Sequence, residues 1–183
     1  TTDLRRMESY MTQETQLFHD SITNNVRVAK PDASMEEIEN ACKKASIHDF
    51  ILSLPKGYET AVGELGDTLS GGERQRIALA RVFYENHDIL IMDEPTAAMD
   101  IRFEKEFYDL VFSYLKDKTI LMISHRLASI TACDRIFYME NGSIIEQGTH
   151  QELMQRQGYY CRLYEAQQEL ESYAGTQQKE VTV

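Results

Sequence analysis

The chain has 183 residues, long enough for one sizeable domain or two small ones, and its 42% hydrophobic content is ordinary for a soluble globular protein. Its 30 acidic and 19 basic residues give a net charge of -11, which argues against a nucleic-acid partner because phosphate backbones bind to basic surfaces. The 3 cysteines lack C-x-x-C spacing and predict neither a disulfide framework nor a zinc site, and no apolar run approaches the ~18 residues of a membrane span.

The chain begins TTDLRRMESYM, without an initial Met or an apolar stretch. This start matches neither a signal peptide nor a natural translation start, so we expect the chain to be a piece of a longer protein. Residues 1–13 are expected to hold the end of a strand that starts further upstream.

Residues 14–87 predict a helical subdomain. One helix begins at the capping box Ser34-x-x-Glu37, in which each residue bonds the backbone N-H of the other. Its expected apolar face consists of Met35, Ile38, Ala41 and Ala45. A second short helix is expected over residues 48–54, followed by a glycine-punctuated loop over residues 58–67.

Residues 88–150 predict a strand, helix, strand unit and a hairpin. The runs ILIM, residues 89–92, and TILMI, residues 119–123, are too uniformly apolar for half-exposed strands, so we expect a parallel sheet buried on both faces. A helix over residues 101–117 would join them. Further on, Asn141-Gly142 suits the tight turn of a hairpin, which needs two residues with positive φ.

The C-terminal residues 151–173 predict one helix, which follows the capping box Thr149-x-x-Glu152. Residues 174–183 have little apolar surface to bury and are expected to form a flexible tail.

Two carboxylates follow the apolar strand in the sequence ILIMDEPT. Asp93 and Glu94 would emerge at the carboxyl edge of the strand, where α/β sheets bind ligands. Because adjacent carboxylates repel each other, Mg²⁺ is the natural counter-ion: Asp93 would hold it and Glu94 would take a proton from an attacking water. The plainer interpretation is a strand end capped by acidic residues before Pro95.

A glycine pair opens a helix in the sequence LSGGERQR. Ser70-x-x-Glu73 is a capping box, and capping alone would explain this spacing. Gly71 and Gly72 also leave backbone N-H groups uncovered at the positive end of the helix dipole, an arrangement that binds phosphate.

In this order the motifs resemble those of the nucleotide-binding domain of ABC transporters. LSGGERQR resembles the signature, ILIMDE Walker B, AAMD the D-loop, ISHR the switch-histidine loop and YMTQETQLF the Q-loop segment. TAVGELG is similar to the loop before the signature in exporters that carry membrane and ATPase segments in one polypeptide. The resemblance covers residues 4–170.

The resemblance implies an α/β fold: a partial P-loop NTPase (RecA-like) core with a parallel sheet, plus the ABC α-helical subdomain. It implies ATP and Mg²⁺ as cofactors, and as partners a second nucleotide-binding domain, in a homodimer or heterodimer, and the transmembrane domains of the same transporter at the cytoplasmic face of the cell membrane. Walker A, G-x-x-x-x-G-K-[ST], lies upstream of the Q-loop in this family and does not occur in this sequence. We therefore expect the isolated chain neither to bind nor to hydrolyse ATP appreciably.

The resemblance also implies a role for each matching residue. Gln13 would touch Mg²⁺ and the attacking water, and His125 would sense the γ-phosphate. Asp93 would hold Mg²⁺ and Glu94 would be the general base. The half-site that faces the partner's ATP would comprise Ser70, Gly71, Gly72 and Glu73, with Asp100 mediating between the two sites.

Three positions depart from the family pattern. The D-loop has Ala97 and Met99 where S-A-L-D is usual, which is expected to weaken communication across the dimer. Leu65 replaces an arginine that exporters usually carry before the signature. Because Glu94 and His125 are kept, we expect this half to be catalytically competent once completed.

Two other functions fit part of the pattern. One is a freestanding regulatory module that docks onto a full ABC ATPase. The other is a related ATPase of DNA repair or chromosome maintenance, which the absence of a heptad run between residues 13 and 69 disfavours. For the isolated chain we also expect self-association, because a sheet with an unpaired apolar edge recruits partners.

Overall fold

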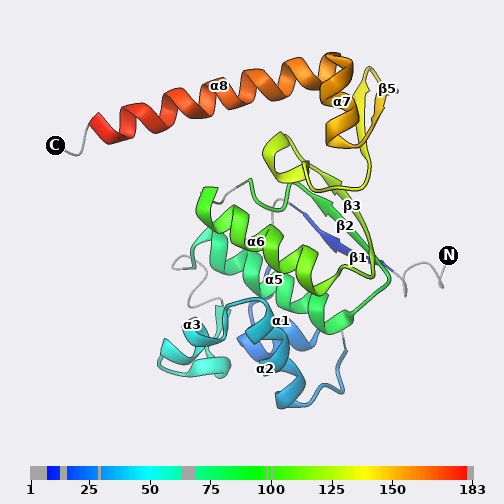
Figure 1. Cartoon of the computed structure of the whole chain (residues 1–183). Coiled ribbons are helices and arrows are strands. Elements are labelled where there is room, and N and C mark those ends of the chain that lie inside the picture. Colours follow the sequence, from blue (N-terminus) through cyan, green and yellow to red (C-terminus); the bar gives the residue numbers. More distant parts are fainter. Residues whose placement is uncertain are drawn as a thin grey trace. The chain divides into compact units, whose positions relative to one another are not determined.

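The computed structural model describes residues 8–12, 16–28, 30–62, 69–97, 99 and 101–180, with the side chains of residues 101 and 174–180 excepted. Contacts divide the chain into two compact units, Thr1–Ile123 and Ser124–Val183 (Figure 1). The boundary falls inside residues 88–150, which the sequence predicted to be one piece of the core. Each unit is described by itself.

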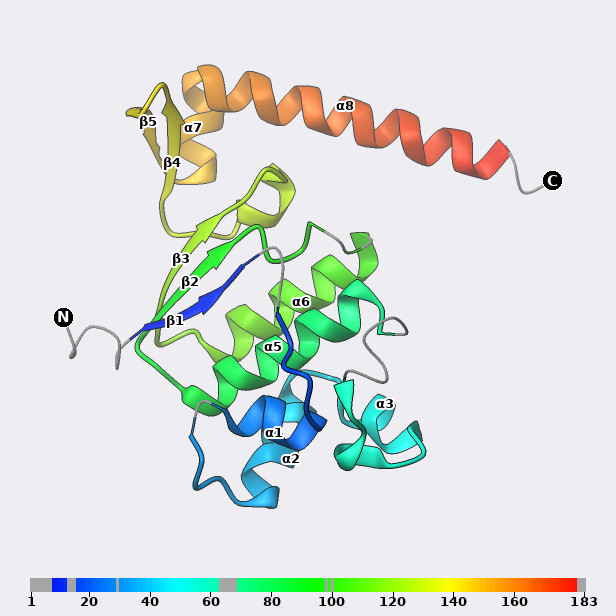
Figure 2. The same ribbon diagram turned by 180° about the vertical axis from the view of Figure 1, so that it is seen from behind.

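The first unit is built on a three-stranded parallel sheet of β1 (Glu8–Met11), β2 (Ile89–Asp93) and β3 (Thr119–Ile123), in that spatial order (Figure 2). Helix α6 (Ile101–Tyr114) connects β2 to β3. The predicted strand, helix, strand unit is confirmed, and β1 lies within residues 1–13, where the end of a strand was expected.

Two helices cover one face of this sheet. Leu90 and Met92 of β2 pack into a core shared with α6 and α5 (Gly71–Glu85), and Figures 1 and 2 show both helices on the same side of the strands. On the other face Tyr10, Leu121 and Ile123 are 60%, 53% and 51% exposed. The prediction that the strands are buried on both faces is wrong for the described residues of the first unit, where the helices that pack on the sheet, α5 and α6, lie on one face.

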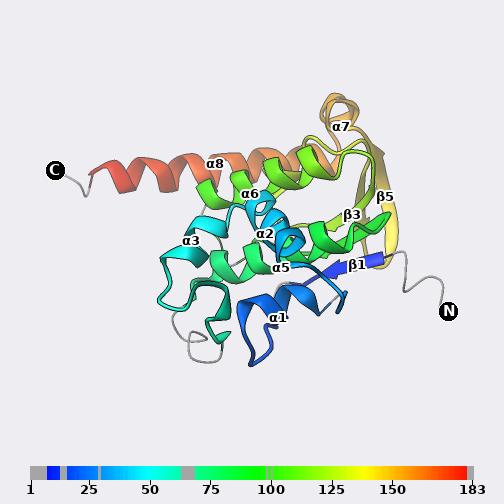
Figure 3. The same cartoon turned by 90° about the horizontal axis from the view of Figure 1, so that it is seen from below.

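The helical subdomain consists of α1 (Ile22–Arg27), α2 (Met35–Lys44), α3 (His48–Ser53) and a short 3-10 turn, η2 (Gly57–Glu59). Figure 3 shows α1 and α2 beside α5. The predicted capping box is present, with the Glu37 N-H donating to Ser34 Oγ at 3.2 Å. Ile38, Ala41 and Ala45 are buried as expected, whereas Met35 at the helix start is 39% exposed. Residues 63–67 of the expected loop lie outside the described residues.

One cysteine belongs to this core. Burial raises the pKa of the Cys42 thiol to about 11, so the side chain stays protonated at neutral pH and packs as a small apolar group. All three cysteines of the chain are free.

The second unit contains a 3-10 turn, η3 (Leu127–Ile130), a hairpin and two helices. The hairpin pairs β4 (Ile136–Glu140) with β5 (Ser143–Gly148). Asn141 and Gly142 have φ of 48° and 75°, as the predicted turn requires.

The single helix predicted over residues 151–173 is two helices, α7 (His150–Arg156) and α8 (Tyr159–Glu180). The chain breaks between them because Gln157 takes a left-handed φ of 52° and a carboxylate from β5 caps the new helix. The N-H groups of Tyr159 and Tyr160 donate to the two carboxylate oxygens of Glu146 at 2.8 and 3.1 Å.

Helix α8 also extends further than expected. Residues 174–180, predicted to be part of a flexible tail, continue it to Glu180. Once a helix is nucleated, each further residue adds a hydrogen bond, so a polar segment can follow a helix that is capped firmly at its start.

We predict that Gly158→Ala destabilises the chain by about 1–2 kcal/mol, because a Cβ at Gly158 would lie 1.9 Å from Glu146 Oε1 and would displace the cap. Urea unfolding measures this loss. Glu146→Ala removes the cap itself, so Gly158→Ala in that background should cost clearly less. Equal losses in both backgrounds would contradict the explanation.

We predict that the exposed sheet face drives self-association of this chain. Leu121→Lys should lower the mean mass in light scattering at a given concentration, since it places a charge on that face. Leu52→Lys, which makes the same change at an exposed leucine of α3, is the matched control. Identical mass distributions for the two variants would refute this surface.

Candidate functional site

The signature residues form the start of α5. The Ser70 N-H donates to Glu73 Oε2 at 2.6 Å, and the Glu73 N-H donates to Ser70 Oγ at 3.2 Å. The predicted capping box is therefore present. Gly71 and Gly72 lie between its two members, in the first turn, where no carbonyl within the helix can accept an N-H. Two adjacent amides at the positive end of a helix of this length suit an anion.

Glycine at position 72 is not required by packing. A Cβ there would meet only Ser70 Oγ at 3.9 Å, an ordinary contact. Glycine also costs a helix about 1 kcal/mol relative to alanine. The fold of this chain therefore gives no reason for Gly72, whereas close approach of a ligand to the backbone would.

Buried polar side chains tie the start of α5 to its surroundings. Gln75, 3% exposed, donates from Nε2 to the Thr12 carbonyl at 3.4 Å. Arg76, 7% exposed, donates to the Ala45 carbonyl at 3.3 Å and pairs with Glu106 Oε2 at 2.7 Å. The signature is thus linked to the end of β1, the end of α2, and α6.

The Walker B carboxylates lie at the carboxyl end of β2. Asp93 is exposed, and Glu94 is half-buried with a φ of 47°, a left-handed conformation that a residue other than glycine rarely adopts. The Glu94 N-H donates to the Ile123 carbonyl at 3.0 Å, and the Ala97 N-H donates to the Glu94 carbonyl at 3.2 Å. A left-handed conformation costs a residue other than glycine on the order of 1–2 kcal/mol.

The turn after Glu94 is fixed to α6 by a buried polar network. Thr96 Oγ1 donates to Glu104 Oε1 at 3.0 Å and lies 3.2 Å from the Tyr108 hydroxyl. Of the two D-loop departures, Met99 is buried and Ala97 is exposed.

The switch-histidine loop follows β3. In the parallel register Asp93 pairs with Ile123, and His125 comes two residues later, at the start of the second unit. Ser124 Oγ accepts the Arg126 N-H at 3.0 Å, so the loop turns back on itself. Asp93 and Ile123, the last residues of β2 and β3, therefore lie at the same edge of the sheet.

Two of the predicted site residues, Gln13 and Asp100, lie outside the described residues. Within the described ranges, no group of three or more His, Cys, Asp or Glu could hold a metal ion. Mg²⁺ needs no such cluster, because it is held by one or two protein carboxylates and completes its shell with water and phosphate oxygens. Asp93, with its carboxylate exposed at the strand end, fits that requirement.

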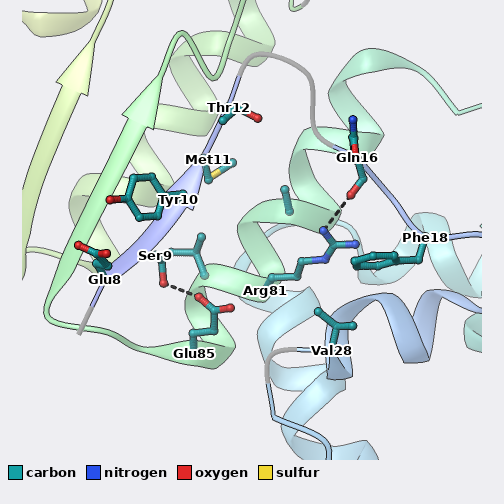
Figure 4. Close-up of a pocket in the computed structure, with 12 residues that line it drawn as sticks. Glu8, Ser9, Tyr10, Met11, Thr12, Gln16, Phe18, Val28, Arg81 and Glu85 are labelled. Carbon is teal, nitrogen blue, oxygen red and sulfur yellow. Dashed lines mark hydrogen bonds between the residues drawn. The ribbon is translucent and has the colours of Figure 1, made fainter. Parts of the chain in front are cut away.

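A cavity of about 290 Å³ lies beside β1, between α5 and the segment from Gln16 to Val28 (Figure 4). Arg81 crosses it, donating to the Asn25 carbonyl at 2.7 Å and the Gln16 carbonyl at 3.1 Å, with its guanidinium 5.5 Å from the Phe18 ring. Burial lowers the pKa of the Arg81 guanidinium from its ordinary value.

Arg81 thus ties Gln16 and Asn25 to α5. Sequence reasoning missed it, and the signal available was a single cation among the apolar residues of ALARVF.

Comparison with known proteins gives the family. The model of the ABC transporter family matches residues 1–97, more than half of the chain. The chain belongs to the ABC transporter family. The predicted family is confirmed.

Its relatives are much longer proteins. "Putative multidrug export ATP-binding/permease protein YgaD" of Bacillus subtilis (strain 168) is 47% identical over 164 residues, which are 90% of this chain and 28% of that protein. A Staphylococcus aureus protein (strain NCTC 8325 / PS 47) with the same descriptive name is 44% identical over 167 residues, 91% of this chain and 29% of its own length. The chain thus spans less than a third of these relatives.

A solved structure of a bacterial Atm1-family ABC exporter with ATP bound superposes with a TM-score of 0.84 at 40% identity, over 91% of this chain and 29% of that one. The predicted fold class, a partial RecA-like core with the ABC helical subdomain, is confirmed. Among the helices of the described residues, none has both the length and the apolar character to cross a membrane.

We predict that Gly72→Ala leaves the chain at least as stable as wild type, with a gain of up to about 1 kcal/mol from helix propensity. Ser70→Ala should instead cost about 1 kcal/mol, because it removes the acceptor of the Glu73 N-H. Urea unfolding of the two variants separates the outcomes. A destabilised Gly72→Ala would show that the fold itself needs the glycine.

Proposed function

We propose that this chain is the part of an ABC exporter's ATPase domain that holds Mg²⁺ and positions the attacking water, and that it presents its signature to the ATP of a second domain. The observation that carries this proposal is the backbone of Glu94. Glu94 holds a left-handed φ of 47°, with its N-H bonded to the Ile123 carbonyl, directly after the exposed Asp93, so two carboxylates stand side by side at the end of a strand.

The carboxylates would act at the γ-phosphate. Asp93 would hold Mg²⁺, which when bound neutralises charge on the phosphate oxygens. Glu94 would accept a proton from the attacking water, and its fixed backbone would spare the cost of orienting that carboxylate during the reaction. Gln13 and His125 would complete the set around the same phosphate.

The signature would stabilise charge on the partner's ATP. In the capping box Ser70 Oγ accepts the Glu73 N-H, which leaves the hydroxyl hydrogen to be donated to a phosphate oxygen. The amides of Gly71 and Gly72 would add two further donors, with Glu73 holding the helix start in shape. Asp100 would lie between the two sites.

The rest of the site would come from the longer protein. Parallel sheets are normally covered on both faces, and here the face that bears Tyr10 and Leu121 is exposed. We propose that the remaining residues of the ATPase domain, including a P-loop, cover this face, and that membrane segments of the same polypeptide dock on the domain at the cytoplasmic side of the membrane. Alone, this chain would not turn over ATP.

The experiment compares ATP hydrolysis and ATP binding by the longer protein that carries this segment. Glu94→Gln should lower turnover by about 100-fold or more while ATP binding persists, because it removes a general base and no binding group. Glu36→Gln, at an exposed site on α2, is the matched control. Full activity of Glu94→Gln, or turnover by the 183-residue chain alone, would contradict the proposal.

The size of the native polypeptide separates this function from a freestanding regulatory module. An antibody raised against the segment should detect a band much larger than 21.1 kDa in the membrane fraction of source cells. A soluble band near 21.1 kDa would favour the regulatory module instead.

A further inference from the structure

The loop that carries His125 is attached to α8 by one side chain. Gln167 donates from Nε2 to the His125 carbonyl at 2.6 Å, and the Leu127 N-H donates to Gln167 Oε1 at 2.9 Å. The two bonds fix the orientation of the amide, because the carbonyl can meet only its nitrogen and the N-H only its oxygen. Both polar atoms of the Gln167 amide are therefore hydrogen-bonded to the two residues that flank Arg126.

The loop itself holds a fixed shape. Ser124 Oγ accepts the Arg126 N-H at 3.0 Å, Ser129 Oγ donates to the Arg126 carbonyl at 2.6 Å, and the two hydroxyls lie 3.2 Å apart. Because these hydrogen bonds connect Ser124, Arg126 and Ser129, we expect the loop to move as a rigid unit. Gln167 connects this rigid loop to α8 through two hydrogen bonds.

The part of α8 that carries Gln167 is held in place by contacts within the second unit. The Glu146 carboxylate caps α8 at Tyr159 and Tyr160. One turn before Gln167, the Tyr164 ring lies 4.9 Å from the ring of His150. Gln167 thus stands on a part of α8 that both a cap and an aromatic contact hold in place.

We infer that Gln167 is a positioning residue for His125, and that α8 sets the angle at which the switch loop presents its histidine to the γ-phosphate. This role rests on the proposed ATPase function. Gln167 acts through the backbone of His125 and does not itself reach the reacting atoms.

At neutral pH the contact needs an amide of this length, with a donor and an acceptor on one side chain. An ionised glutamate can still accept from the Leu127 N-H, yet it has no hydrogen for the His125 carbonyl and would repel it. A protonated glutamate has both a donor and an acceptor. Gln167→Glu should therefore recover as the pH falls toward the ordinary carboxyl pKa of about 4.3.

The test measures kcat and KM for ATP in the longer protein. Gln167→Ala should lower kcat by about tenfold, the loss expected from two hydrogen bonds, with KM changed less than twofold. Gln168→Ala, at the next and exposed glutamine of α8, is the matched control and should retain wild-type kcat. The activity of Gln167→Glu relative to wild type should rise as the pH is lowered.

A second measurement uses the 183-residue chain and needs no catalysis. Amide hydrogen exchange at Leu127 should be at least about fivefold faster in Gln167→Ala than in Gln168→Ala, since only the first removes the acceptor of that N-H. Gln167→Glu at neutral pH should keep Leu127 protected.

An inactive wild-type longer protein would overturn the proposed function, and this role with it. With an active wild type, equal kcat for Gln167→Ala and Gln168→Ala would overturn the inference alone. A loss carried by KM, or a constant activity ratio for Gln167→Glu across pH, would also overturn it.

Discussion

The hydrogen bond from the Glu94 N-H to the Ile123 carbonyl is the interaction on which the rest of the first unit's chemistry depends. It is the last bond of the ladder between β2 and β3 and belongs to the Asp93–Ile123 pair, where β2 ends. Without it, the chain could leave the sheet in an ordinary extended conformation. With it, Glu94 is held in a left-handed turn directly beside the exposed Asp93. The two carboxylates thereby sit on one rigid edge.

A second constraint is that α5 and α6 both pack on the same face of the sheet. Helices α5 and α6 bury Leu90 and Met92, and the polar anchors Gln75 and Arg76 fix the direction of α5 on that surface. The signature therefore has a defined place relative to β1 even though its own turn is held mainly by local bonds. Packing fixes the helix, and capping fixes its first turn.

The sequence predicted local features well. Capping boxes at Ser34, Ser70 and Thr149 were all found, because each depends on two residues three positions apart. The hairpin turn followed from Asn141-Gly142 for the same reason.

Features that depend on distant partners were missed. The break before α8 requires Glu146 from another element, and the contact of Gln167 with the His125 loop spans 42 positions. The positive φ of Glu94 could not be predicted either, since its partner belongs to a strand that begins 25 positions later, at Thr119. The exposed sheet face shows the limit of composition: the runs ILIM and TILMI predicted burial on both faces, and in the described residues of the first unit one face is exposed.

The closed capping box of the signature has a consequence for assembly. Because Ser70 and Glu73 already satisfy each other, the helix start has its final shape before any phosphate arrives. Under the proposed function, joining two domains around ATP would require no local folding of this element, and the entropy lost would be that of bringing two preformed bodies together. The rate of closure would be set by the encounter of the domains, and the signature would act as a rigid template in that encounter.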